Sequence, residues 1–189
     1  MNLFTIDEIV SSILEETKGL DEEITDGMIL SNKEISPSEI EKLKSKLEIE
    51  YLDLVFTEDI LSYNWGNLGF LSYQFGYGDE ISLNWLINRN LEYEEYPILH
   101  KMDLIIIANG DPYTILLECK SGNIYAFTSD MSYDDIILIA SDFREFVRAM
   151  GTAQYAVWKK AEKVFVELMS KELTGRSLEF WKELVQEFS

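Results

Sequence analysis

Histidine and cysteine are nearly absent from this sequence of 189 residues, which contains one of each, His100 and Cys119. A metal site built on several histidines is therefore excluded, and we expect His100 to have a surface or capping role. A single cysteine excludes an internal disulfide, which agrees with a reducing compartment. Because Cys119 ends an apolar run in an expected strand, we predict a small core residue there rather than a nucleophile.

Long apolar runs are also missing from the chain. No stretch approaches the roughly 20 apolar residues that a membrane-spanning helix needs. The first ten residues, MNLFTIDEIV, carry acids where a secretory signal would carry bases. The sequence therefore predicts a cytoplasmic protein with no membrane partner.

Basic residues are scarce, since 16 Lys and Arg stand against 35 Asp and Glu and give a formal charge of −19. Residues 151–189 are balanced, with six bases and six acids, so the excess of acids lies in residues 1–150. Such a field repels phosphate backbones and attracts cationic partners. We therefore expect no nucleic-acid partner. Charge alone leaves two explanations open, which are attraction of a basic partner and simple solubility.

Apolar residues are plentiful, at 47%, and they include ten Phe, ten Tyr and four Trp. This composition excludes disorder and provides a proper core for one domain. Three runs rich in β-branched and aromatic residues, at 104–107, 113–119 and 124–127, predict a meander of three strands. Turn residues separate these runs at 108–112 and 120–123.

Helical patterns surround the meander. Thr5 and Glu8 have the form of a capping box, and Ser36 is a cap candidate before a Pro at the first helical position. An apolar stripe from Ile139 to Met150 predicts a helix that covers one face of the sheet. The remaining stretches are predicted as strand or helix at 51–63, strand at 68–75, a short helix at 81–91, an acidic loop at 91–100, and helices at 153–168 and 178–188.

This order of elements predicts an α+β fold with a central, mainly antiparallel sheet flanked by helices. We expect one α+β domain at residues 1–150, with its core at about 36–150 and an additional N-terminal helix. Residues 151–189 are expected to form a helical extension. It would pack on this core or pair with a second subunit in a homodimer.

Several segments stand in a characteristic order and spacing. The helix-forming SPSEIEKLKSKLEI and the Gly-aromatic run WGNLGFLSYQFGYG precede Tyr96-Pro97-Ile98, the turn at Gly110-Asp111, the strand LLECKSGNIYAF and, most specifically, IASDFREFVRAM. Over about residues 36–150 they resemble the SUKH superfamily. One departure is that the Leu-Pro-x-x-Tyr-x-x-Phe-Leu segment of this family is not visible after the first helix, where Glu50-Tyr51-Leu52-Asp53 stands.

The resemblance implies an α+β protein that has no catalytic residues and needs no cofactor. Bacterial members of this superfamily are typically immunity proteins that bind and neutralise toxin domains, often nucleases. Fungal members regulate cell-wall synthesis through protein interactions. A basic toxin domain is thus the expected partner, and an acidic body would attract it over long range.

Acids are interleaved with tyrosines in three stretches, at 77–80, 93–96 and 129–135. Tyrosine beside carboxylates suits a surface that receives Lys and Arg side chains. We therefore predict a partner-binding surface there, with the residues Tyr77, Asp79, Glu80, Tyr93, Glu94, Glu95, Tyr96, Tyr133, Asp134 and Asp135.

An alternative function uses the acids of the meander. Asp103 and the sequence Glu118-Cys119-Lys120 have the outline of a D…E-x-K nuclease core, with Asp111 as another candidate for the first acid. In such a core two acids bind Mg²⁺ and the lysine orients water or stabilises charge. The pattern is short and occurs often by chance, and an acidic body repels phosphate. The competing interpretation is that these side chains lie at strand ends and on the sheet surface without catalytic roles.

Overall fold

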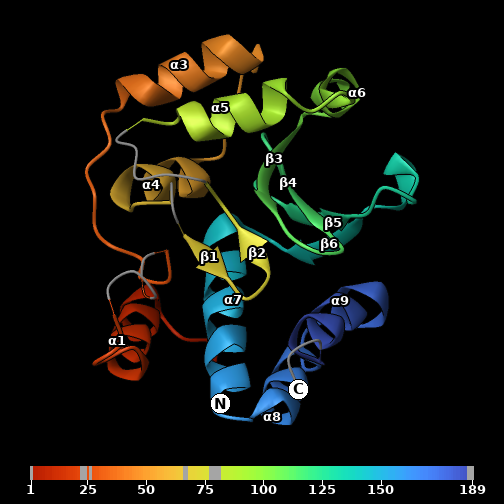
Figure 1. The fold of residues 1–189 in the computed structure, drawn as a ribbon. Helices are drawn as coiled ribbons and strands as arrows, with labels where there is room; N and C mark the ends of the chain where they lie inside the picture. The colour runs from red at the N-terminus through yellow and green to blue at the C-terminus, as the bar shows by residue number, and fades with distance from the viewer. Residues whose placement is uncertain (1, 22–24, 26, 66–67, 77–81, 187–189) are drawn as a thin grey trace.

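A computed structural model describes residues 2–21, 25, 27–65, 68–76 and 82–186, and these residues form an α+β fold (Figure 1). Each strand pairs antiparallel with the next along the chain, so the sheet has the order β1-β2-β3-β4-β5-β6. The predicted fold class is confirmed, and the predicted meander forms the centre of the sheet. The strands are β1 Gly69–Phe70, β2 Tyr73–Gln74, β3 Leu104–Asn109, β4 Thr114–Glu118, β5 Ile124–Phe127 and β6 Ile137–Ala140.

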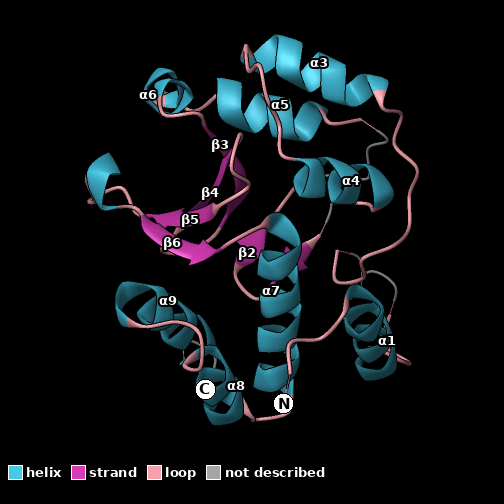
Figure 2. Cartoon of the chain, turned by 180° about the vertical axis from the view of Figure 1, so that it is seen from behind, coloured by secondary structure: helices cyan, strands magenta, loops and turns pink. Residues whose placement is uncertain are grey.

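The helices lie around this sheet (Figure 2). Their bounds are α1 Ile6–Glu16, α3 Ser38–Leu47, α4 Leu54–Ser62, α5 Asn84–Leu91, α6 Tyr96–Lys101, the 3₁₀ helix η1 Tyr133–Asp135, α7 Phe143–Trp158, α8 Glu162–Met169 and α9 Gly175–Gln186. The predicted capping box of α1 is present, with Thr5 and Glu8 bonded in both directions. No helix in the described parts of the chain is long and apolar enough to cross a membrane.

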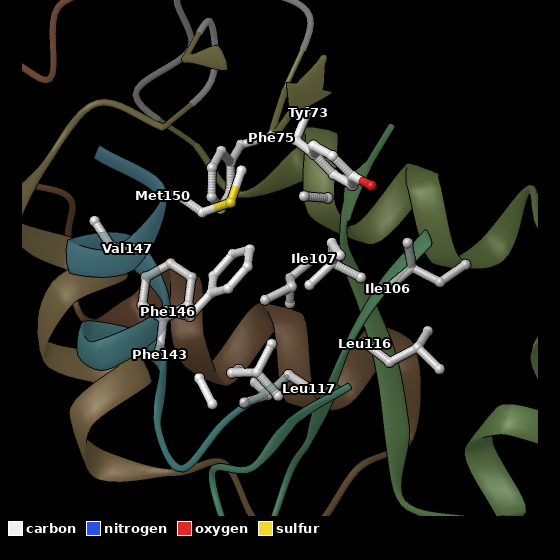
Figure 3. Packing of buried hydrophobic residues seen from close by; sticks show 14 of the residues in the cluster. Tyr73, Phe75, Ile106, Ile107, Leu116, Leu117, Phe143, Phe146, Val147 and Met150 are labelled. Atoms are coloured by element: carbon white, nitrogen blue, oxygen red, sulfur yellow. The ribbon is translucent and has the colours of Figure 1, made fainter. Parts of the chain in front are cut away.

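The two faces of the sheet have different surroundings. In β4, Leu117 lies on the side of Phe143 and Phe146 of α7, whereas Leu116 points away from that helix (Figure 3). We call the first side the α7 face and the second the outer face. Register extends the outer face across the sheet, because Ile106 and Tyr125 are the partners of Leu116 in β3 and β5. The α7 face is sealed by aromatic side chains, since Phe143 packs against Phe56, Trp65 and Phe75.

Helix α5 covers the edge of β3, which pairs with β2 only at Asn109 and Gln74. The fully buried Asn90 accepts a hydrogen bond from the Ile106 amide at 2.7 Å and donates one to the Ile106 carbonyl at 2.9 Å. Arg89 donates to the Ile107 carbonyl at 3.0 Å. These side chains satisfy backbone groups that would otherwise be buried without partners.

The expected helix from Ile139 to Met150 is wrong at both ends. Ile139 belongs to β6, and α7 begins only after Asp142, whose side chain accepts a hydrogen bond from the Glu145 amide at 2.7 Å. The extended backbone of Asp142 makes it a cap, so the strand and the helix are separate elements. Beyond Met150 the helix continues without a break to Trp158, so α7 crosses the expected boundary at residue 150.

Three other local predictions also need correction. The segment 68–75 is a hairpin of β1 and β2 rather than one strand, with Leu71 in the left-handed region at the turn. The expected loop at 91–100 contains α6, which has Pro97 in its first turn. Helix α3 begins at Ser38 with Pro37 rather than Ser36 in the N-cap position, although the Ser36 hydroxyl accepts a hydrogen bond from the Ser38 amide at 3.4 Å.

The C-terminal helices pack on the rest of the chain. Helix α9 contacts β6 and α7, and the indole of Trp181 donates a hydrogen bond to the Ile139 carbonyl at 3.1 Å. Trp181 also packs against Phe146 of α7 and Phe165 of α8. This packing adds a second layer of apolar side chains on the α7 face beside β6.

Candidate interaction surface

Two of the three predicted acidic loops meet in the structure. The Tyr93 hydroxyl, from the segment between α5 and α6, lies 3.3 Å from a carboxylate oxygen of Glu95 and 3.4 Å from the Tyr133 hydroxyl of η1. The Tyr133 hydroxyl donates a hydrogen bond to the same Glu95 oxygen. We call these three residues the tyrosine clasp. It joins segments that lie about 40 residues apart in the sequence.

The sheet positions both tyrosines of the clasp. The Tyr133 ring stacks on Phe127 of β5 with a centroid distance of 4.8 Å and an angle of 14°. Tyr93 lines a hollow of about 470 Å³ together with Ile106 of β3 and Thr114 of β4. Because β4 lies between β3 and β5, the clasp spans the outer face above β4. Leu116 of β4, on the same face, is fully buried.

The clasp also affects protonation. Burial raises the pKa of Tyr133, and its hydrogen bond to Glu95 raises it further, because ionisation would place two negative charges side by side. Tyr133 therefore remains a hydrogen-bond donor throughout the physiological pH range.

Exposed acids lie on either side of the clasp. Glu94 precedes α6, and Asp134 and Asp135 belong to η1, where the Ser132 hydroxyl accepts a hydrogen bond from the Asp134 amide. Asp135 lies 3.9 Å from Arg176 of α9, at the long end of the ion-pair range and with both side chains largely exposed. Such a pair contributes little to stability, so the carboxylate remains accessible to a partner.

The structure corrects the prediction for Tyr96. Its side chain is only 9% exposed, and its hydroxyl donates to the Leu47 carbonyl at 2.7 Å. The ring thus anchors α6 to the end of α3 instead of facing a partner. Tyr77, Asp79 and Glu80 lie outside the described residues.

The predicted nuclease residues divide between two ends of the meander. Asp103 precedes β3 next to Glu118, and burial followed by repulsion from Glu118 raises its pKa. The Glu118 carboxylate already accepts hydrogen bonds from Ser121 at 2.6 Å and from Tyr125 at 3.2 Å. Lys120 lies with its ammonium 5.9 Å from the centre of the Tyr51 ring.

Asp111 lies in the turn between β3 and β4, at the other end of these strands, so it does not join Asp103 and Glu118. Within the described ranges, no three His, Cys, Asp or Glu side chains are grouped so that they could hold a metal ion. Cys119 is fully buried, and burial raises the pKa of its thiol to about 12. Its placement agrees with the predicted core role.

No protein-family model matches this sequence, and no curated protein matches it either. The residues of the chain itself must therefore carry the assignment. Tyr125 and Leu138, which the sequence does not single out, face each other on the outer face. Residues 137–139 are all aliphatic, so no sequence pattern separates the exposed Leu138 from the buried Ile137 and Ile139.

Proposed function

We propose that this protein is a non-catalytic binding protein of the immunity type, which neutralises a basic, nuclease-type toxin domain by direct contact. The observation that carries the proposal is the meeting of the two acidic loops at the tyrosine clasp. The composition of these loops alone predicts a binding surface. A surface assembled from two distant segments gives a partner one continuous patch of aromatic rings and carboxylates.

Electrostatics supports a cationic partner. The body carries a large negative charge, and Glu94, Asp134 and Asp135 project it at this surface. Complementary potentials accelerate association and discriminate against wrong partners. Tyrosine rings beside the acids add contact area at low entropic cost, and interfaces are enriched in them.

The resemblance to the SUKH superfamily supports the same function. An α+β fold with an antiparallel sheet is the class that the resemblance implies, and the bacterial members are typically toxin-binding proteins. A regulatory protein of the cell-wall-synthesis type would use a similar surface for a housekeeping partner. The identity of the partner distinguishes these two roles.

A Mg²⁺-dependent nuclease is a second candidate, favoured only by the proximity of Asp103 and Glu118. Three donors already engage one oxygen of Glu118, and the acidic body repels a nucleic-acid substrate. Calorimetry with Mg²⁺ and a plasmid-cleavage assay on wild type and Lys120→Ala test this function. The nuclease function would be established if the wild type binds Mg²⁺ and cleaves the plasmid while Lys120→Ala does not cleave it.

Co-expression tests the immunity function. When a basic, nuclease-type toxin domain is encoded beside this gene, cells that produce it should survive if they also produce this protein. The variant carrying Glu94→Lys, Glu95→Lys, Asp134→Lys and Asp135→Lys should protect poorly at equal protein level. If the wild type gives no protection and does not bind the toxin domain, the proposal is wrong.

A further inference from the structure

The outer face of the sheet carries an aliphatic side chain that its neighbours leave uncovered. Leu138 lies in the middle of β6 and is 45% exposed, whereas Ile137 and Ile139 on either side of it are buried. Leu138 is the register partner of the half-buried Tyr125 in β5. Directly opposed residues on one sheet face are in contact distance, so the two side chains form one apolar patch. We call it the Tyr125–Leu138 patch.

Coverage of the outer face changes along the sheet. Over β3 and β4 the face is closed, since Ile106 and Leu116 are buried, and Tyr93 lies beside Ile106. At Tyr125 of β5 and Leu138 of β6 it is only partly covered, although α7 and α9 contact β6. Figure 1 shows α6 and the short helical turn between β5 and β6 on the side of the sheet away from α7. Leu138 remains 45% exposed beside them, so the patch continues the surface of the clasp.

Carboxylates lie at both ends of the patch. Glu118 accepts a hydrogen bond from the Tyr125 hydroxyl at 3.2 Å at one end. At the other end, Asp134 and Asp135 precede β6 by two to three residues, and Glu95 holds the clasp. Among the described residues, the one base that contacts these acids is Arg176. Its ion pair with Asp135 is long, at 3.9 Å, and therefore weak. The patch therefore has an apolar centre and negatively charged ends. A partner segment with an apolar residue flanked on both sides by Lys or Arg would match it.

We propose that the Tyr125–Leu138 patch is a docking site for such a segment of a basic protein partner. It places an apolar side chain on Leu138 and Tyr125 and its flanking cations near Glu118 and the acids of η1. This inference rests on the proposed function, because it assigns the apolar anchor of the same interface. The acidic loops provide attraction and specificity, and the patch provides the desolvated contact that slows dissociation.

Two equally exposed aliphatic residues allow a matched test. Leu138 and Val164 are both 45% exposed, and Val164 lies on α8 away from the outer face. Leu138→Lys and Val164→Lys change the net charge equally, so any difference between them reports on position alone. The probe is the toxin domain against which this protein protects in the co-expression test, inactivated at a catalytic residue, and its affinity is measured by calorimetry at physiological salt. A third variant, Leu138→Thr, removes the apolar side chain but keeps a residue that favours strands. Thermal unfolding checks that all three variants fold.

We expect Leu138→Lys to weaken binding at least about tenfold, which corresponds to about 1.4 kcal/mol. Leu138→Thr should weaken it to a smaller extent, and Val164→Lys should stay within about threefold of the wild type. Equal affinities for Leu138→Lys and Val164→Lys would overturn the docking site while the proposed function stands. Failure of the wild type itself to bind would overturn both.

Discussion

The two faces of the central sheet use aromatic residues in different ways. On the α7 face, phenylalanines and tryptophans such as Phe143, Phe146 and Trp65 are buried and pack against each other. On the outer face, tyrosine hydroxyls reach carboxylates, and Tyr133 stacks on Phe127. Tyr125 bonds to Glu118, and the clasp tyrosines share Glu95.

This difference separates stability from binding. A phenylalanine contributes in proportion to the ring area that leaves water, whereas a tyrosine can bury its ring and keep its hydroxyl at a wet boundary. The α7 face therefore stabilises the fold, and the outer face can meet a partner without first exposing the core. Changes on the two faces should affect different measurements.

The largest expected effect lies on the α7 face. Phe146 is fully buried between Phe75 and Trp181, with ring centroids 6.4 and 6.3 Å away. Phe146→Ala should lower the free energy of unfolding by about 3–5 kcal/mol, because it removes a buried ring and leaves a cavity. Urea unfolding measures the change. Leu138→Ala on the outer face is the control and should cost about 1 kcal/mol or less, and a similar loss for both variants would contradict the division between the faces.

A smaller effect is expected for the clasp. Tyr133→Phe removes the hydrogen bond to Glu95 and should lower the free energy of unfolding by about 1 kcal/mol at neutral pH. The raised pKa of Tyr133 adds a pH dependence with a definite sign. The unfolded tyrosine loses its proton near pH 10, while the folded one retains it. The stability from this hydroxyl is therefore complete below about pH 10 and declines as the pH rises above that value.

Unfolding curves at neutral and alkaline pH test this dependence. Stability of Tyr133→Phe should decline less between about pH 9 and pH 11 than that of the wild type. If the free energy of unfolding declines equally in both proteins at alkaline pH, the hydrogen bond between the Tyr133 hydroxyl and Glu95 does not stabilise the fold.

The smallest expected effect concerns the thiol of Cys119, which should not react with thiol reagents in the folded protein. Cys119 is fully buried, and burial, followed by the charges of Asp103 and Glu118, raises the pKa of its thiol to about 12. The folded protein should therefore not react with a thiol reagent at neutral pH, and one thiol per chain should react in denaturant. Equal labelling rates in both states would mean that this end of the sheet is accessible.

The meander was predictable because its signals are local. The strand at Ile124–Phe127 has the predicted bounds, and the turn residues on either side of β4 fix the hairpins. Ile139 was assigned to the wrong element because it fits two patterns at once. It continues the helical spacing of Phe143 and Phe146, and it also alternates with Leu138 as a strand residue. The N-cap at Asp142 starts the helix after Ile139 and so leaves Ile139 in the strand. This cap requires an extended backbone at Asp142, which the sequence alone does not show.

The candidate surface was predictable only in part. Composition identified the segments of Glu95 and Tyr133, but their contact depends on the order of strands in the sheet. Tyr96 looks like Tyr93 in the sequence, and only the packing of α6 against α3 shows that it is buried. Leu138 could not be told from the buried Ile137 and Ile139 in the sequence, because its exposure follows from its place on the outer face opposite Tyr125.

Affinity for the toxin domain at low and at raised salt tests the central claim most directly. The wild type should bind tightly at low salt and lose affinity steeply as salt increases, because exposed carboxylates attract the basic partner. The variant with Lys at positions 94, 95, 134 and 135 should bind at least about a hundredfold more weakly at low salt, a change of about 2.7 kcal/mol, with a much flatter salt dependence. Equal affinity and an equal salt slope for the two proteins would contradict the assignment of this surface.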